Sequence, residues 1–147
     1  MPATEFYLDT SVLIKLYVPE AFSVEVEHFM AGIERPVISR LSVLEWHCAM
    51  ARRQRTGAFP ASYLKAARQE FTRHLAEGYF LVQTFGDAQF IAALEILDAV
   101  KPTPLRTLDA LHLAATHIAG LKHIATADKV MADAAQKLGI TVETFFA

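Results

Sequence analysis

The chain has 147 residues, a length that suits a single domain spanning residues 1–147, and its 53% apolar residues are enough to fill a hydrophobic core. Charged residues make up 20% of the chain, and the absence of like-charge blocks and low-complexity runs argues against disorder. The sequence shows neither the charged and apolar regions of a signal peptide nor an uncharged apolar stretch of membrane-spanning length. We therefore expect a cytoplasmic protein with no membrane association.

The only cysteine, Cys48, has no partner for an internal disulfide, which agrees with a cytoplasmic location. It lies in an apolar segment with helical spacing. We therefore expect a buried, inert thiol.

Predicted strands and helices alternate along the chain. The first strand, "FYL", precedes a helix that ends before Pro19, and the stretch "YFLVQTF" is the strongest strand signal because it is rich in aromatic and β-branched residues. The predicted strands are 6–8, 36–39, 79–85, 122–126 and 140–145. The predicted helices are 11–18, 23–33, 42–55, 60–77, 87–100, 108–119 and 128–138. This alternation predicts an α/β fold with a central parallel sheet of four to five short strands and helices on both faces.

Charge is distributed unevenly along the sequence. The segment from Arg35 to Arg73, here called the basic segment, contains eight basic and two acidic residues, whereas the whole chain has a formal net charge of −2. One face of the molecule is therefore expected to be basic.

Four acidic residues follow predicted strands at corresponding places. Asp9 comes directly after "FYL", Asp128 follows "HIAT", Asp109 lies in the first turn of a helix, and Glu45 lies one turn into the helix after "PVIS". Ligands of such sheets bind beyond the carboxyl ends of the strands, so we expect all four side chains at one edge.

Each acid also has a simpler interpretation. Asp9, Asp109 and Asp128 suit helix N-caps or first turns, where a carboxylate satisfies free amides and favours the helix dipole. Glu45 lies among apolar residues, where partial exposure or a buried ion pair would explain it.

Four clustered carboxylates would repel one another and raise their own pKa values unless a cation neutralised them. Mg²⁺, with Mn²⁺ as its substitute, prefers such oxygen ligands, and Thr10, Ser11 and Thr126 add hydroxyls nearby. A zinc site built on His112 and His117 is disfavoured, because residues five apart on a helix diverge by about 140°. We expect His112 to be packed or hydrogen-bonded and His117 to lie on the surface.

The segments "YLDTSVLIKLYVPE", "SVLEWHCAMAR", "RTLDALHLAATH" and "IATADKVMADAAQKLGITV" resemble, in that order, the motifs of PIN-domain ribonucleases, and their spacing resembles VapC-type toxins. The resemblance covers nearly the whole chain. It implies a PIN-like fold and an endoribonuclease, dependent on Mg²⁺ or Mn²⁺, that is the toxin of a toxin-antitoxin system. It also implies an RNA substrate, a homodimer and a small cognate antitoxin that binds near the acids.

Carried over to this sequence, the resemblance makes Asp9, Glu45, Asp109 and Asp128 the metal-binding and catalytic acids. Ser11 and Thr126 match supporting polar positions. We further expect the basic segment to contact RNA phosphates. Its candidate residues are Arg52, Arg53 and, more weakly, Arg40, together with Lys15 outside the segment; a solvated charged face is the alternative for each.

Two other functions compete with the nuclease. A phosphatase with Asp9 as its nucleophile would usually have a second aspartate two positions later, where this chain has Ser11. A PIN-fold module that binds RNA or protein without catalysis has no need of all four acids.

Overall fold

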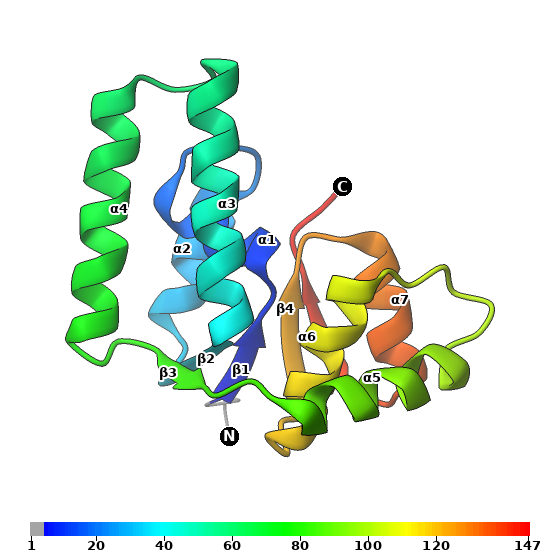
Figure 1. The fold of residues 1–147 in the computed structure, drawn as a ribbon. Coiled ribbons are helices and arrows are strands. Elements are labelled where there is room, and N and C mark those ends of the chain that lie inside the picture. The colour runs from blue at the N-terminus through cyan, green and yellow to red at the C-terminus, as the bar shows by residue number, and fades with distance from the viewer. Residues whose placement is uncertain (1–4) are drawn as a thin grey trace.

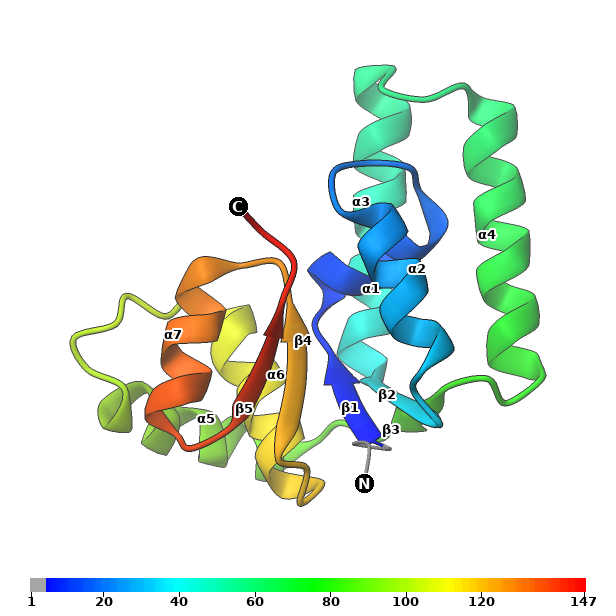
Figure 2. The ribbon, with the colours of Figure 1, turned by 180° about the vertical axis from the view of Figure 1, so that it is seen from behind.

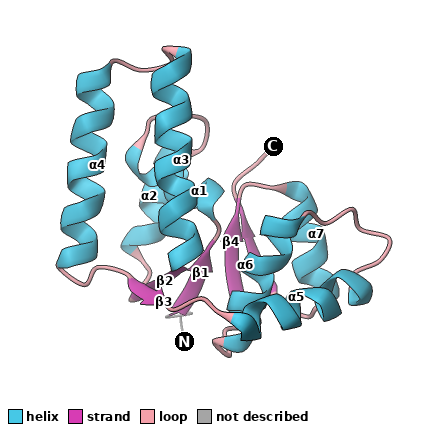
Figure 3. Ribbon diagram, in the orientation of Figure 1, coloured by secondary structure: helices cyan, strands magenta, loops and turns pink. Residues whose placement is uncertain are grey.

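The structure is a computed structural model that describes residues 5–147. Residues 1–4 lie outside this range. They belong to the predicted single domain, and the expectation that the N-terminus is not a signal peptide also concerns them. Five parallel strands form one sheet in the order β3-β2-β1-β4-β5, with β1 at its centre (Figures 1 and 3). The strands are β1 (Glu5–Leu8), β2 (Arg35–Ser39), β3 (Leu81–Gln83), β4 (His123–Thr126) and β5 (Thr141–Thr144).

Seven helices within the described range surround this sheet, and both of its faces are covered (Figures 1 and 2). Side chains along β1 alternate between the two faces of the sheet, and both faces are apolar: Phe6 and Leu8 pack into one core, and Tyr7 between them packs into the other. The predicted fold class is therefore confirmed. The helices are α1 (Thr10–Tyr17), α2 (Ser23–Ala31), α3 (Arg40–Thr56), α4 (Ala61–Ala76), α5 (Asp87–Ala99), α6 (Thr107–Ile118) and α7 (Lys129–Lys137).

Helices α1 to α4 supply the core on one face, where Trp46, Phe71 and Leu13 are fully buried. Helices α5 to α7 supply the other core with small residues such as Ala114 and Ala134, which allow close packing on the sheet. Helices α3 and α4 form a long hairpin that extends well beyond the sheet (Figure 1). Within residues 5–147, none of the helices combines the length and apolar character that crossing a bilayer requires.

Local signals in the sequence fix how α3 leaves β2. The Ser39 side chain accepts a hydrogen bond from the Ser42 amide at 3.3 Å, and the Ser42 hydroxyl accepts one from the Ser39 amide at 3.0 Å. This reciprocal cap starts α3 at the carboxyl end of β2. Gly57, with φ of 72°, ends the helix in the left-handed conformation that glycine adopts without strain.

The strongest strand signal in the sequence gives the shortest strand. Only Leu81–Gln83 of the predicted strand 79–85 pairs with β2, at an edge of the sheet. Tyr79 stacks on His74, and buried Phe80 packs on Phe71, with ring centroids 5.0 and 6.0 Å apart. Their aromatic character therefore serves the packing against α4 rather than strand pairing.

The prediction that Cys48 is buried is wrong, because its side chain is exposed. Leu44, which fits the apolar spacing of α3, is also 63% exposed. Both residues line the pocket described below. Apolar residues that recur at the helical period predict an apolar side of the helix, but they do not show whether that side faces the core or a pocket.

Candidate active site

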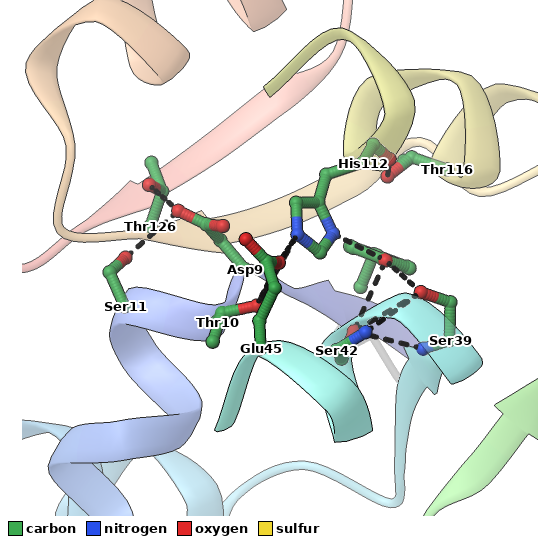
Figure 4. A network of polar contacts seen from close by, with 10 residues as sticks. Asp9, Thr10, Ser11, Ser39, Ser42, Glu45, His112, Thr116 and Thr126 are labelled. Carbon is green, nitrogen blue, oxygen red and sulfur yellow. Dashed lines mark hydrogen bonds and ion pairs between the residues drawn. The ribbon is translucent and has the colours of Figure 1, made fainter. Parts of the chain in front are cut away.

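Asp9 follows β1 directly and starts α1. Its backbone amide donates to the Ala125 carbonyl at 3.0 Å, which ties it to β4, and its carbonyl accepts from the Val12 and Leu13 amides. The side chain makes no capping bond to α1, so capping does not explain the carboxylate. Instead Oδ2 accepts hydrogen bonds from the hydroxyls of Ser11 and Thr126, both at 2.8 Å (Figure 4).

Asp128 caps α7 as the simpler interpretation predicts. Its Oδ1 accepts from the amides of Val130 at 2.8 Å and Met131 at 3.2 Å. Thr126 links this acid to Asp9, because its hydroxyl accepts from the Asp128 amide at 3.0 Å while it donates to Asp9. The second oxygen, Oδ2, is left out of the cap.

Glu45, on α3, reaches across to α1 and α6. Its Oε1 accepts a 2.8 Å hydrogen bond from the Thr10 hydroxyl and is paired with Nε2 of His112 (Figure 4). Burial alone raises the pKa of Glu45, but the bonds from His112 and Thr10 outweigh it, so the pKa is lowered and the side chain is a carboxylate. Glu45 is thus a partly buried ion pair, one of the two alternatives considered for it.

His112 is 1% exposed, and polar groups contact both of its ring nitrogens. Nδ1 lies 2.7 Å from the Tyr7 hydroxyl, which is itself 2.9 Å from the Ser39 hydroxyl. Burial lowers the pKa of His112, but the oxygens of Tyr7, Glu45 and Asp9 outweigh burial and raise it to about 10. The expectation of a hydrogen-bonded His112 and a surface His117 is confirmed.

Asp109 lies in the first turn of α6. Its Oδ2 is buried and has no hydrogen-bond partner within the part of the chain that the structure describes. Burial raises the pKa of Asp109 above its ordinary value, and the carboxylates of Asp128 and Asp9 raise it further. Such an oxygen is costly to bury unless a proton or a cation compensates it.

The four predicted acids line one pocket of about 430 Å³ at the carboxyl edge of the sheet. Three of them share a pattern: one oxygen of Asp9, Glu45 and Asp128 is held by hydrogen bonds, while the other has no such bond among residues 5–147. No three metal-ligating side chains of the described residues are near enough to one another to enclose an ion by themselves. The other lining residues are Thr10, Ser11, Ile14, Leu41, Leu44, Cys48, Ala49, Arg52 and Leu108.

The four predicted phosphate-binding residues lie in different settings. Arg52 lines the pocket, one turn beyond Cys48. Arg53 and Lys15 both pair with Glu20, at 2.9 and 3.3 Å. Arg40 is exposed at the first position of α3 and is not part of the pocket lining.

Sequence reasoning missed Arg106. Its guanidinium lies 3.8 Å from Oδ2 of Asp109 and 4.0 Å from Oδ2 of Asp128, and its side chain is 82% exposed. The i, i+3 spacing of Arg106 and Asp109 was the available signal. The acids therefore have a cation on each side, with Arg52 on α3 and Arg106 at the start of α6.

The PIN domain family model matches residues 6–137. The chain belongs to the PIN domain family. A comparison with functionally curated proteins returns no significant match. The four acids therefore lie at the carboxyl edge of a PIN-domain sheet.

Solved structures share this fold at low sequence identity. VapC20 of Mycobacterium tuberculosis, described as a sarcin-ricin loop cleaving toxin, has a TM-score of 0.68 and 16% identity over 88% of this chain and 94% of that one. FitAcB of Neisseria gonorrhoeae has a TM-score of 0.67 and 17% identity, covering 93% and 95% of the two chains. A toxin-antitoxin complex from Klebsiella pneumoniae has a TM-score of 0.58 and 18% identity, covering 84% and 86%.

Proposed function

We propose that this PIN domain is a metal-dependent endoribonuclease that hydrolyses RNA phosphodiester bonds, acting in the cytoplasm as the toxin of a toxin-antitoxin pair. One observation carries the proposal. Asp9, Glu45 and Asp128 each have one oxygen fixed by hydrogen bonds and a second without such a bond within residues 5–147, and all three line the same pocket. Carboxylates held in this way are oriented before any ligand binds.

The donor set fits Mg²⁺ or Mn²⁺. All four acids supply the hard oxygen ligands that these ions prefer. The buried Oδ2 of Asp109 has no hydrogen-bond partner among residues 5–147 and lies 3.8 Å from the Arg106 guanidinium, so a metal ion would compensate it further. We propose that Asp9, Glu45, Asp109 and Asp128 hold the ion, partly through water molecules. When bound, the ion would supply an activated water and stabilise charge that builds on the phosphoryl oxygens.

The surrounding residues orient these acids and position the substrate. Ser11 and Thr126 hold Asp9, whereas Thr10 and His112 hold Glu45. Arg52 and Arg106 provide positive charge on either side of the acids, where phosphates flanking the cleaved bond would otherwise be repelled. The pairing of Arg53 and Lys15 with Glu20 makes them weaker candidates for contact with RNA.

The toxin role is supported by the family match and by the neighbours in fold, among them a sarcin-ricin loop cleaving toxin and a toxin-antitoxin complex. We infer that a small antitoxin protein is a partner of this chain. We also infer a homodimer, which an exposed apolar stripe on α5 supports. Phe90, Ile91, Leu94 and Leu97 of this stripe are between 37% and 69% exposed.

The test is cleavage of a mixed pool of structured RNAs by purified protein with Mg²⁺, with Mn²⁺ and with EDTA. We expect cuts at discrete sites that require metal and are lost in Asp9→Asn. The matched control is Asp98→Asn, which changes an aspartate that is 81% exposed on α5 and pairs with Lys101 at 3.0 Å. Retained RNA binding without cleavage in the wild type would favour the binding module instead.

A further inference from the structure

Strand β5 forms an edge of the sheet, and its pairing with β4 shows which of its backbone groups point away from β4. The amides of Thr141 and Phe145 donate to the carbonyls of Lys122 and Thr126, at 2.9 and 3.0 Å. Backbone groups of a strand point alternately to its two sides, so the N–H and C=O groups of Val142 and Thr144 point away from β4. These outward groups are the template that an added strand requires.

A groove of about 620 Å³ lies beside this edge, between α2 and the end of β5. Figure 2 shows both elements on the same side of the molecule, with β5 at the margin of the sheet. Apolar side chains line much of the groove, including Val24, which is 75% exposed. The full lining is Phe22, Val24, Glu25, His28, Phe29, Glu143, Thr144 and Phe145.

The charge of this groove is negative. Glu25 on α2 and Glu143 on β5 are exposed carboxylates, and the lining contains no lysine or arginine. The nearby Lys129 lies outside the lining, with its Nζ 5.6 Å from the centroid of the Phe146 ring. A basic side chain would therefore be attracted between Glu25 and Glu143.

We propose that the β5 edge and this groove bind an extended segment of a partner polypeptide as a sixth strand. The segment would bond through its backbone to Val142 and Thr144, and its alternate side chains would enter the groove as two apolar residues with a basic residue between them. This inference goes beyond the proposed nuclease and does not depend on it, because none of the four acids contributes to the groove.

The position of the groove also gives the bound segment a path toward the acid pocket. Thr144 is in register with Thr126, whose hydroxyl bonds to Asp9. A segment that continues past Thr144 therefore reaches the edge of the sheet where the acids lie. A partner bound on β5 is well placed to cover the pocket with residues that follow the added strand.

The first measurement is residue-resolved hydrogen exchange, with and without the peptide acetyl-Thr-Val-Thr-Arg-Thr-Val-Thr-amide. Without peptide, the amides of Val142 and Thr144 should exchange rapidly and those of Thr141 and Phe145 slowly. The peptide should protect Val142 and Thr144 specifically, which only an added strand explains. Protection elsewhere, or none at saturating peptide, would overturn the proposal.

The second measurement is the Kd of a fluorescent form of this peptide, which we expect to be about 100 μM or tighter. Thr144→Pro removes an outward N–H without touching the ladder to β4 and should weaken binding more than about 10-fold, whereas Thr144→Ala should not. Glu143→Lys, or a peptide with Glu in place of Arg, should weaken binding as well. Equal affinity for wild type, Thr144→Pro and Glu143→Lys would rule out this site.

Discussion

At the residue scale, Asp109 differs from the other acids because its oxygen without a hydrogen-bond partner among residues 5–147, Oδ2, is buried. Its raised pKa has a consequence for stability. A carboxyl group whose pKa is higher in the folded than in the unfolded protein stabilises the fold only while it is protonated. That contribution is lost as the pH rises above the ordinary value of 3.8 and through the folded-state pKa.

We therefore predict that Asp109→Asn raises the free energy of unfolding of the metal-free protein at pH 8, while cleavage falls by more than about 100-fold. The gain should be smaller at pH 4, because a larger fraction of the wild-type carboxyl is protonated there than at pH 8. Urea unfolding in EDTA at both pH values measures it, and Mn²⁺ should stabilise the wild type but not the variant. A variant less stable than wild type at both pH values would contradict this account of Asp109.

Thr126 connects two of the acids, since it donates to Asp9 and accepts from the Asp128 amide. Thr126→Val keeps the shape of the side chain, removes one of the two hydrogen bonds that Asp9 Oδ2 accepts, and takes its partner from the Asp128 amide. We predict a loss of about 1–3 kcal/mol in stability and about 10- to 100-fold in Mn²⁺ affinity and cleavage. Thr116→Val is the control, because Thr116 is equally buried and its hydroxyl donates to the His112 carbonyl at 2.9 Å instead of to an acid. Unchanged Mn²⁺ affinity in Thr126→Val would show that Thr126 does not position Asp9.

At the scale of elements, α3 carries both Glu45 and Arg52, the arginine of the pocket lining. Glu45 and Arg52 are seven residues apart, about two helical turns, so they lie on nearly the same side of the helix. The neighbouring Arg53 is directed instead to Glu20. Two adjacent arginines of one helix therefore have different surroundings, and their substitution should have different effects.

Arg52→Gln should weaken RNA binding about uniformly across sequences and reduce the slope of log K against log salt concentration by about 1. Arg53→Gln should leave that slope unchanged and lower stability slightly, because a partly exposed ion pair contributes about 0–1 kcal/mol. Binding is measured in Ca²⁺ at several salt concentrations, with Arg73→Gln on α4 as the control. Equal slopes for Arg52→Gln and wild type would exclude contact between Arg52 and phosphate.

The order of the elements was predictable because each has its own local signal, such as Pro19 after α1 and Gly57 after α3. The convergence of the acids was predictable too, since parallel strands bring their carboxyl ends to one edge. The exposure of Cys48 was not, because it depends on what the neighbouring helices leave uncovered. The pairing of Arg53 with Glu20 joins residues 33 positions apart, and no short-range pattern predicts such a contact.

At the scale of the whole molecule, the two faces of α5 differ in what covers them. Ala93 and Ile96 pack into the core, whereas Phe90, Leu94 and Leu97 remain exposed at the spacing of a continuous helical stripe. A stable dimer buries about 800 Å² on each partner, usually around such an apolar centre. The stripe therefore marks α5 as the surface through which two copies are expected to associate.

We predict that the wild type sediments as a dimer, with twice the 16.3 kDa mass of the chain, and that Leu94→Glu sediments as a monomer. A glutamate at this position, which is 69% exposed in one copy, would be buried without a partner at the interface but well solvated in the monomer. Tyr63→Glu, which changes a 41% exposed residue on α4, should leave the dimer intact. Sedimentation velocity over a range of protein concentrations distinguishes these outcomes. A wild type that stays monomeric, or a Tyr63→Glu variant that dissociates as readily as Leu94→Glu, would exclude α5 as the interface.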